Sequence, residues 1–179
     1  MQNRLSISVR LFAAAAVLLF FGLVWLYTRE FPVFSNTIGV RTLVLASCVA
    51  GILAGSGMIY TLRHRLTPWD KHLPEVGIIL AFPIIFAPLL GSLINRAGGS
   101  REHQSFEFIS EQAFISSNYG LLKGEKIKPT GYSIYVKEGD RLLRFQYKSQ
   151  AYYPITRRGE AVLLPVRKGL LGFRVVELK

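Results

Sequence analysis

The apolar positions in the first hundred residues gather into three long runs that contain no charged side chain. The runs cover residues 11–27, 42–62 and 76–95. A helix needs about 20 residues, and about 17 at the short end, to cross the ~30 Å hydrocarbon core of a bilayer. We therefore predict three transmembrane helices. The first is predicted to be a retained signal anchor, because the bulky and charged sequence after residue 27 offers no cleavage site.

From residue 101 onward, apolar and polar residues alternate, with a period that is typical of half-buried β-strands. Phe106 and Phe108 alternate with polar neighbours. Residues 132–136 and 143–147 alternate in the same way on either side of a short turn at 138–140, which contains a glycine. Two alternating segments around such a turn predict a β-hairpin.

A second pair of strands is predicted near the end of the chain. Residues 161–166 and 170–178 flank a turn-like sequence at 167–169. Proline cannot donate a hydrogen bond to a sheet, so Pro165 would place the first of these strands at an edge or at a bulge. Residues 112–117 are a weaker strand candidate and precede a long connection.

These patterns predict a membrane α + β fold, with three transmembrane helices followed by a small antiparallel β-sheet or barrel domain. The predicted division is a three-helix transmembrane domain at 1–96 and a soluble β-rich domain at 101–179. Residues 97–100 contain two adjacent glycines and a serine, so we predict a short flexible linker between the domains.

The net charge suggests which partners the chain has. The 179 residues include 22 Lys and Arg against 11 Asp and Glu, which gives a net charge of +11. The basic residues are spread along the chain and flank the apolar runs. Membrane lipids are therefore the expected anionic partner, together with a membrane-protein partner, and no nucleic acid is expected.

The basic residues near the ends of the spans predict the orientation, because cytoplasmic loops carry an excess of Lys and Arg. Three spans place the two termini on opposite sides. One side would carry Arg4, Arg10, Arg63, Arg65 and Lys71, and the other Arg29, Arg41, Arg96 and Arg101. This bias predicts an integral membrane protein with a cytoplasmic N-terminus and a C-terminal domain on the other side. The absence of an N-x-Ser/Thr sequon from residues 101–179 is consistent with a bacterial inner membrane, where that domain would be periplasmic or extracellular.

Small residues recur every four positions in the second span, where Ser47, Gly51 and Gly55 share one helical face. Small side chains let two helix backbones approach closely, which drives helix association in membranes. The face could contact another subunit, or it could pack against the other spans of the same chain. We favour the second interpretation, because the motif is common in proteins with several spans.

The sequence offers no pattern typical of catalysis, of a cofactor or of a metal site, so we expect a protein that is not an enzyme. The apolar runs contain no ionisable Asp, Glu, Lys, Arg or His, which argues against a pump, a proton-coupled carrier or an ion channel. His64, Asp70 and His72 share a polar loop, where such side chains are usually solvated. Cys48 follows a lipobox-like sequence, but the apolar run continues to residue 62, so we predict a buried helix residue.

Aromatic and basic residues interleave between positions 147 and 158. The candidate binding surface of the C-terminal domain comprises Tyr147, Lys148, Tyr152, Tyr153, Arg157 and Arg158. Aromatic faces stack and cations meet anionic groups, so this surface would suit an anionic lipid, a glycan or a partner protein. The alternative is a set of half-buried strand residues whose basic neighbours lie on the solvated face.

We hypothesise a non-catalytic accessory or assembly subunit of a larger membrane complex, docked through the small-residue face of the second span, with a partner-binding β-domain. A second hypothesis is a membrane-bound immunity or envelope-sensing module whose exposed domain captures one protein ligand. A third is an enzyme that acts on lipid or glycan at the membrane surface.

Overall fold

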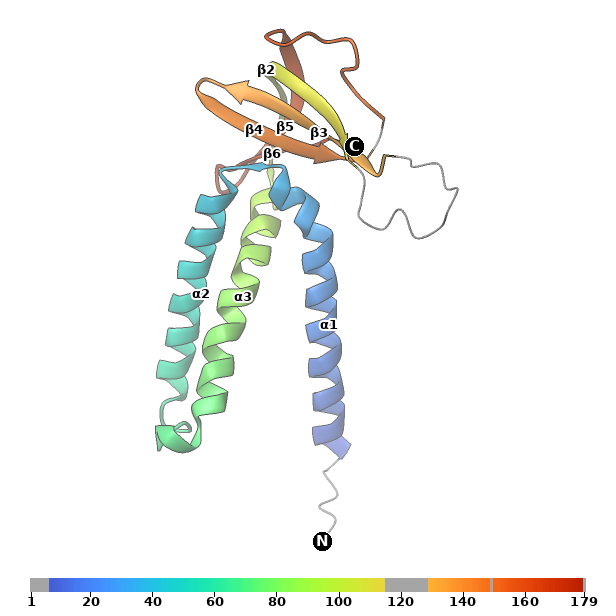
Figure 1. Cartoon of the computed structure of the whole chain (residues 1–179). Coiled ribbons are helices and arrows are strands. Elements are labelled where there is room, and N and C mark those ends of the chain that lie inside the picture. The colour runs from blue at the N-terminus through green and yellow to red at the C-terminus, as the bar shows by residue number, and fades with distance from the viewer. Residues whose placement is uncertain (1–6, 115–128, 149, 179) are drawn as a thin grey trace. The chain divides into compact units, whose positions relative to one another are not determined.

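The computed structural model describes residues 7–114, 129–148 and 150–178 (Figure 1). Three helices in these ranges are long and apolar enough to cross a membrane, which confirms the predicted spans. They are α1 (Ile7–Ser35), α2 (Val40–Leu62) and α3 (Leu73–Ala97). Residues 1–31 form one compact unit, which holds most of α1, and residues 32–179 form a second unit with α2, α3 and the strands.

The strands of the described residues form one antiparallel sheet of six strands in the order β1-β6-β5-β2-β3-β4. Their bounds are β1 (Thr37–Ile38), β2 (Gly99–Phe114), β3 (Gly131–Glu138), β4 (Arg141–Tyr147), β5 (Ala161–Gly169) and β6 (Arg174–Val176). The sheet is nearly closed, so the predicted helices followed by a barrel-like β-domain are confirmed. The candidate strand at 112–117 is the end of β2 as far as Phe114, and its last residues lie outside the described ranges.

The predicted hairpin is formed by β3 and β4, which pair from Tyr132↔Tyr147 to Glu138↔Arg141. Gly139 in the connecting turn has a φ angle of +57°, a left-handed conformation that glycine adopts without steric cost. The alternation therefore set the register, and the glycine allowed the tight turn.

The second predicted pair is also present, as β5 and β6, but its turn lies later in the chain. Arg167 and Lys168 belong to β5 and pair with Val175 and Arg174, so the turn follows Gly169. Pro165 lies in a strand between β2 and β6, not in an edge strand.

Proline is tolerated at position 165 because the β5–β6 ladder stops one residue later in the chain. The ladder reaches only as far as Val166↔Val176. Beyond it, the carbonyl of Pro165 still accepts a hydrogen bond from the backbone N–H of Glu177 at 2.9 Å. The N–H and the C=O of a strand residue point to the same side. The N–H that Pro165 lacks would therefore also point toward β6, beyond the last residue pair of the ladder, where no strand bond is lost.

The inward side chains of the sheet form the core of the β-domain. Phe145, Ile134 and Leu164 are at most 2% exposed. The complete buried cluster is Phe106, Phe108, Ile134, Val136, Phe145, Tyr147, Val162, Leu164, Val166 and Val176. Burying one such large side chain contributes roughly 1.5–3 kcal/mol, so this cluster is the main source of stability of the domain.

Asn36, between α1 and β1, connects the two outer strands of the sheet. Its side-chain amide donates to the carbonyl of Gln146 in β4 at 2.7 Å, and its side-chain oxygen accepts from the Gln146 N–H at 2.7 Å. Its own carbonyl accepts from the N–H of Val176 in β6 at 2.9 Å. One buried side chain thus makes the hydrogen bonds that a strand residue would make, and it closes the gap between β1 and β4.

Residues 97–100, predicted as a flexible linker, form a short, closely packed connection between α3 and β2 in the structure. Ala97 ends α3 and Gly99 begins β2, so only Gly98 separates the helix from the strand. Gly99 has a φ angle of +124°, and a methyl group there would collide with the carbonyl oxygen of Lys168. Glycine is required here by close packing and by backbone conformation.

Candidate functional site

The small residues of α2 face α3 of the same chain. A methyl group at Gly51 would lie 2.7 Å from the carbonyl oxygen of Pro83, and one at Gly55 would lie 3.1 Å from the carbonyl oxygen of Ile79. Ser47 is buried on the same face. The arrangement is that of packing within the chain, and α3 occupies the face that the other interpretation would give to a second subunit.

The six residues of the candidate binding surface separate in the structure. Tyr147 is only 4% exposed and belongs to the core. Lys148, Arg157 and Arg158 are exposed. Tyr152 and Tyr153 line a hollow on the surface of the β-domain, so they are the members of the set that a ligand could reach together.

Glu111 fixes these two tyrosines in place. Its carboxylate accepts hydrogen bonds from the Tyr147 hydroxyl and from the backbone N–H groups of Tyr152 and Tyr153, the last two at 2.9 and 3.1 Å. The ring of Tyr147 stacks on Tyr132 and meets Tyr152 edge-on, with centroids 5.8 and 5.0 Å apart. One carboxylate and a row of aromatic rings therefore hold the segment after β4 against the sheet.

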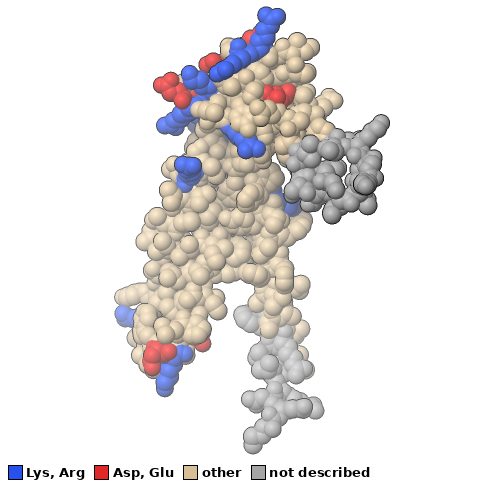
Figure 2. Space-filling view, in the orientation of Figure 1, with Lys and Arg blue, Asp and Glu red and all other residues tan. Residues whose placement is uncertain are grey.

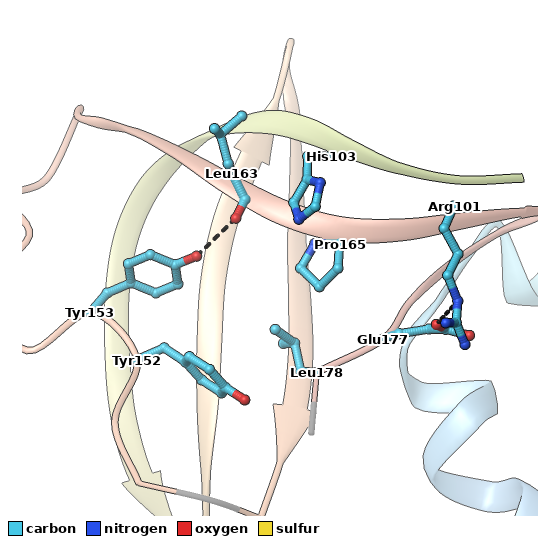
Figure 3. A pocket seen from close by; sticks show the side chains of 8 residues that line it. All are labelled: Arg101, His103, Tyr152, Tyr153, Leu163, Pro165, Glu177 and Leu178. Carbon is cyan, nitrogen blue, oxygen red and sulfur yellow. Dashed lines mark hydrogen bonds and ion pairs between the residues drawn. The ribbon is translucent and has the colours of Figure 1, made fainter.

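The hollow has a volume of about 450 Å³, a size that can accept a few side chains or a small ligand (Figure 3). We call it the β5 groove. Its lining residues are Arg101, His103, Tyr152, Tyr153, Leu163, Pro165, Glu177 and Leu178.

The floor of the β5 groove is apolar although it lies on the outer face of a strand. Val162, Leu164 and Val166 point into the core, so alternation places Leu163 and Pro165 on the outer face. The side chain of Leu163 is 61% exposed. An outward leucine and proline beside two tyrosines resemble the apolar centre of a protein–protein contact surface more than a solvated sheet face.

Within the described residues, β5 pairs with β6 only from Val166 onward, so its first half has an open side away from β2. This open side is protected against the addition of another strand. Tyr153 donates its hydroxyl to the carbonyl of Leu163 at 3.0 Å, and Pro165 has no N–H to offer (Figure 3). Burial raises the pKa of Tyr153, and the charges of Glu111 and Tyr152 act in the same direction. The hydroxyl therefore stays a neutral donor, and the groove presents side chains to a ligand in place of a free strand edge.

One end of the β5 groove is charged. Glu177 lies between two arginines, with Oε2 at 3.0 Å from Nε of Arg101 and Oε1 at 2.8 Å from Nε of Arg167. These arginines are direct cross-strand neighbours, whose like charges would repel each other without the carboxylate. Since two cations share one anion, this end of the groove keeps a positive charge, and the Arg101 side chain is 71% exposed.

A second polar cluster lies on the inward face of the sheet, at one end of the core. Arg174 donates to both carboxylate oxygens of Glu138 at 2.6 and 2.9 Å and to the side-chain oxygen of Gln104 at 2.8 Å. Gln104 also donates to Glu138 at 2.9 Å. The hydrogen bond from Arg174 lowers the pKa of Glu138 against the opposing effect of burial, with help from the Arg174 charge and from Gln104. The groups satisfy one another, so the cluster is structural.

The histidines do not form a metal centre within the part of the chain that the structure describes. His64, Asp70 and His72 lie in the α2–α3 loop, where His72 is 3.7 Å from Glu75. No group of three or more His, Cys, Asp or Glu residues in the described ranges is placed to hold a metal ion.

Sequence reasoning found the tyrosines of the β5 groove and missed its floor and its charged end. A local signal for the floor exists. A half-buried strand alternates between apolar and polar residues, whereas residues 161–166 are apolar at every position. The charged end has no such signal, since Arg101 lies in β2 and Glu177 directly follows β6, and the two meet only through the sheet pairing.

Comparisons with protein-family models, with curated proteins and with solved structures found no match for this chain.

Proposed function

We propose that the protein is a non-catalytic accessory or assembly subunit of a membrane complex and that the β5 groove binds a segment of a partner protein. The observation that supports this most directly is the outward, 61% exposed Leu163 on the floor of the groove. An apolar side chain of the partner would fill the space above Leu163 and Pro165, between the tyrosines and Leu178.

The charge of the groove limits the kind of partner segment. Arg101 is largely exposed and shares the carboxylate of Glu177 with Arg167. A carboxylate of the partner would give Arg101 a second charge-assisted hydrogen bond. The expected ligand is therefore a protein segment with an apolar anchor and an acidic residue beside it.

Two asparagines would couple binding at the groove to the membrane spans α2 and α3. Asn36 lies directly before β1, and Asn95 in the last turns of α3 binds the β5–β6 turn. Because the β-domain is tied to α3 by buried hydrogen bonds, a partner held in the groove would be held at a fixed height above the bilayer. Such fixed placement suits an assembly subunit.

We further propose that the protein lies in a bacterial inner membrane with the β-domain outside the cytoplasm. The α2–α3 loop carries Arg63, Arg65 and Lys71, while Arg4 precedes α1 and Arg10 lies near its start, on the same side of a three-span protein. This excess supports a cytoplasmic loop.

The proposal is tested by purifying the tagged full-length protein in a mild detergent and identifying stoichiometric partners. Leu163→Glu places a charge on the groove floor, and Leu142→Glu makes the same change at an outward β4 residue that is 65% exposed. We expect the first variant to lose the partner and the second to keep it. Retention by both variants, or loss from both, contradicts the assignment of the groove.

The immunity or sensing hypothesis uses the same groove and differs in the nature of its ligand. A ligand that is a single soluble protein, bound with saturation and without other membrane subunits, would favour that function. Copurification of several membrane proteins would favour the accessory role.

A further inference from the structure

The β5–β6 turn lies at the level where α3 ends its apolar run. Asn95 accepts from the backbone N–H groups of Leu170 and Leu171 at 2.9 and 3.1 Å, and it donates to the carbonyl of Phe173 at 3.1 Å. Since the candidate span ends at Ala97, two residues after this asparagine, the turn would be held at the membrane boundary.

The tip of this turn is apolar and exposed. The side chains of Leu170 and Leu171 are 63% and 48% exposed. Leu170 also packs beside Gly98, where a methyl group would lie 2.8 Å from its Cδ2 atom. Two adjacent exposed leucines are unfavourable in water, but they fit the boundary between lipid head groups and acyl chains.

Basic side chains gather at the same level of the β-domain. Arg96 lies in the last turn of α3, and the sheet pairs Ser100 with Lys168 and Arg101 with Arg167. Figure 2 shows basic side chains over the β-domain and an uncharged band along α2 and α3. The cations thus lie where an apolar region meets a polar one, which is the position of lipid phosphates.

The charge at this level remains positive after its ion pairs are counted. Glu177 contacts Arg101 and Arg167, and Arg167 also donates to the backbone carbonyl of Arg96 at 3.3 Å. Glu102 follows Arg101 in β2 and points to the opposite face of the sheet, the face that also carries Lys168. Arg101, Arg167 and Lys168 outnumber these two carboxylates, and the side chain of Lys168 is exposed.

We propose that the leucine tip, with Arg101 on one face of the sheet and Lys168 on the other, forms a binding site for an anionic phospholipid. The leucines lie against the acyl chains, and the cations bind the phosphate and the negatively charged head group. The site lies below the β5 groove and shares only Arg101 with it, so it goes beyond the proposed partner binding.

The test titrates the full-length protein in neutral detergent with phosphatidylglycerol or with phosphatidylcholine and counts bound lipids by native mass spectrometry. We expect tighter retention of phosphatidylglycerol, and a loss of roughly fivefold for each cation removed in the double variant Arg101→Gln/Lys168→Gln. The double variant Arg157→Gln/Arg158→Gln removes the same charge from exposed positions of the loop before β5 and should retain the lipid. Circular dichroism verifies that each variant is folded.

Two further variants separate the acyl contact from the charge and this site from the β5 groove. Leu170→Ser/Leu171→Ser leaves every charge in place and should also weaken phosphatidylglycerol binding, because the acyl contact is lost. Lys168→Gln alone should weaken lipid binding and leave partner binding at the β5 groove intact, which separates this site from the proposed function. Equal loss in the two charge-neutralised double variants, or full displacement of the lipid by soluble glycerol phosphate, overturns the proposal.

Discussion

At the scale of single residues, two asparagines determine how the β-domain is closed and how it is attached. Asn36 bonds to Gln146, 110 positions away in the sequence, and Asn95 bonds to Phe173, 78 positions away. Neither role can be read from the sequence, because an asparagine at a helix end is locally indistinguishable from a common capping or turn residue. Their partners are defined only by the complete sheet.

Replacing Asn36 with alanine should open the gap between β1 and β4. The change removes two side-chain hydrogen bonds and leaves backbone groups of Gln146 without their partner, which costs about 1–3 kcal/mol. Hydrogen exchange of the Gln146 amide should accelerate roughly tenfold or more, because this amide donates to Asn36 Oδ1. Ser35→Ala, at the exposed neighbouring residue, should leave the exchange rate unchanged, and an equal effect of both changes would contradict the role of Asn36.

Protonation of Glu138 should make the β-domain less stable in acid. Its pKa in the folded protein is lowered by the hydrogen bonds from Arg174 and Gln104, so its contribution is complete above the ordinary glutamate pKa of about 4.3. The contribution is lost as the pH falls through the lower folded pKa. Glu138→Gln should therefore flatten the fall of the unfolding midpoint as the pH drops below the ordinary glutamate pKa.

The matched control for this pH effect is Glu107→Gln, at an exposed position of β2. It should preserve the pH dependence of the unfolding midpoint. If the unfolding midpoint of Glu138→Gln falls at low pH as steeply as that of the unchanged protein, the ion pair with Arg174 does not contribute to the pH dependence of stability.

At the scale of elements, local pattern predicts most of what the structure contains. Length and hydropathy predict the spans, and alternation predicts β2, the β3–β4 hairpin and the β5–β6 pair, because each pattern depends on nearby residues. The local pattern predicts the turn at residues 167–169, which is too early, since Arg167 and Lys168 look like turn residues but continue the ladder. The two-residue strand β1 has no local signal, because pairing with β6 alone defines it.

The packing of α2 on α3 should depend on the size of residue 51. Gly51→Ala would bring a methyl group within 2.7 Å of the Pro83 carbonyl oxygen, so the helices must separate, at a cost of about 1–3 kcal/mol. Gly57→Ala in the same helix meets nothing within 4 Å and should slightly raise stability. Thermal unfolding in detergent compares the two variants. Equal midpoints would show that the α2–α3 contact is looser than the structure indicates.

At the scale of the whole molecule, sequence predicts the class of fold and leaves the binding site incomplete. The aromatic and basic segment led to Tyr152 and Tyr153, but Arg101, Leu163 and Glu177 join them only through the pairing of β2, β5 and β6. A groove made by three strands is a product of topology, and one-dimensional patterns cannot show it.

The proposed orientation predicts which loops are accessible from outside the cell. In a Cys48→Ala background, Ile155→Cys at a 91% exposed position should react with a membrane-impermeant maleimide in intact spheroplasts. His64→Cys in the α2–α3 loop should react only after the membrane is permeabilised. The reverse pattern of labelling would place the β-domain in the cytoplasm.

The central claim, that the β5 groove binds a partner protein, is tested most directly by site-specific photo-crosslinking in intact membranes. A benzophenone amino acid replaces Leu163 in the full-length protein, and a matched variant carries it at Leu142 on an outward position of β4. We expect one discrete cross-linked membrane partner from position 163, lost when Tyr152 and Tyr153 are changed to alanine, and none from position 142. The absence of a cross-link at 163, or the same product from both positions, would contradict it.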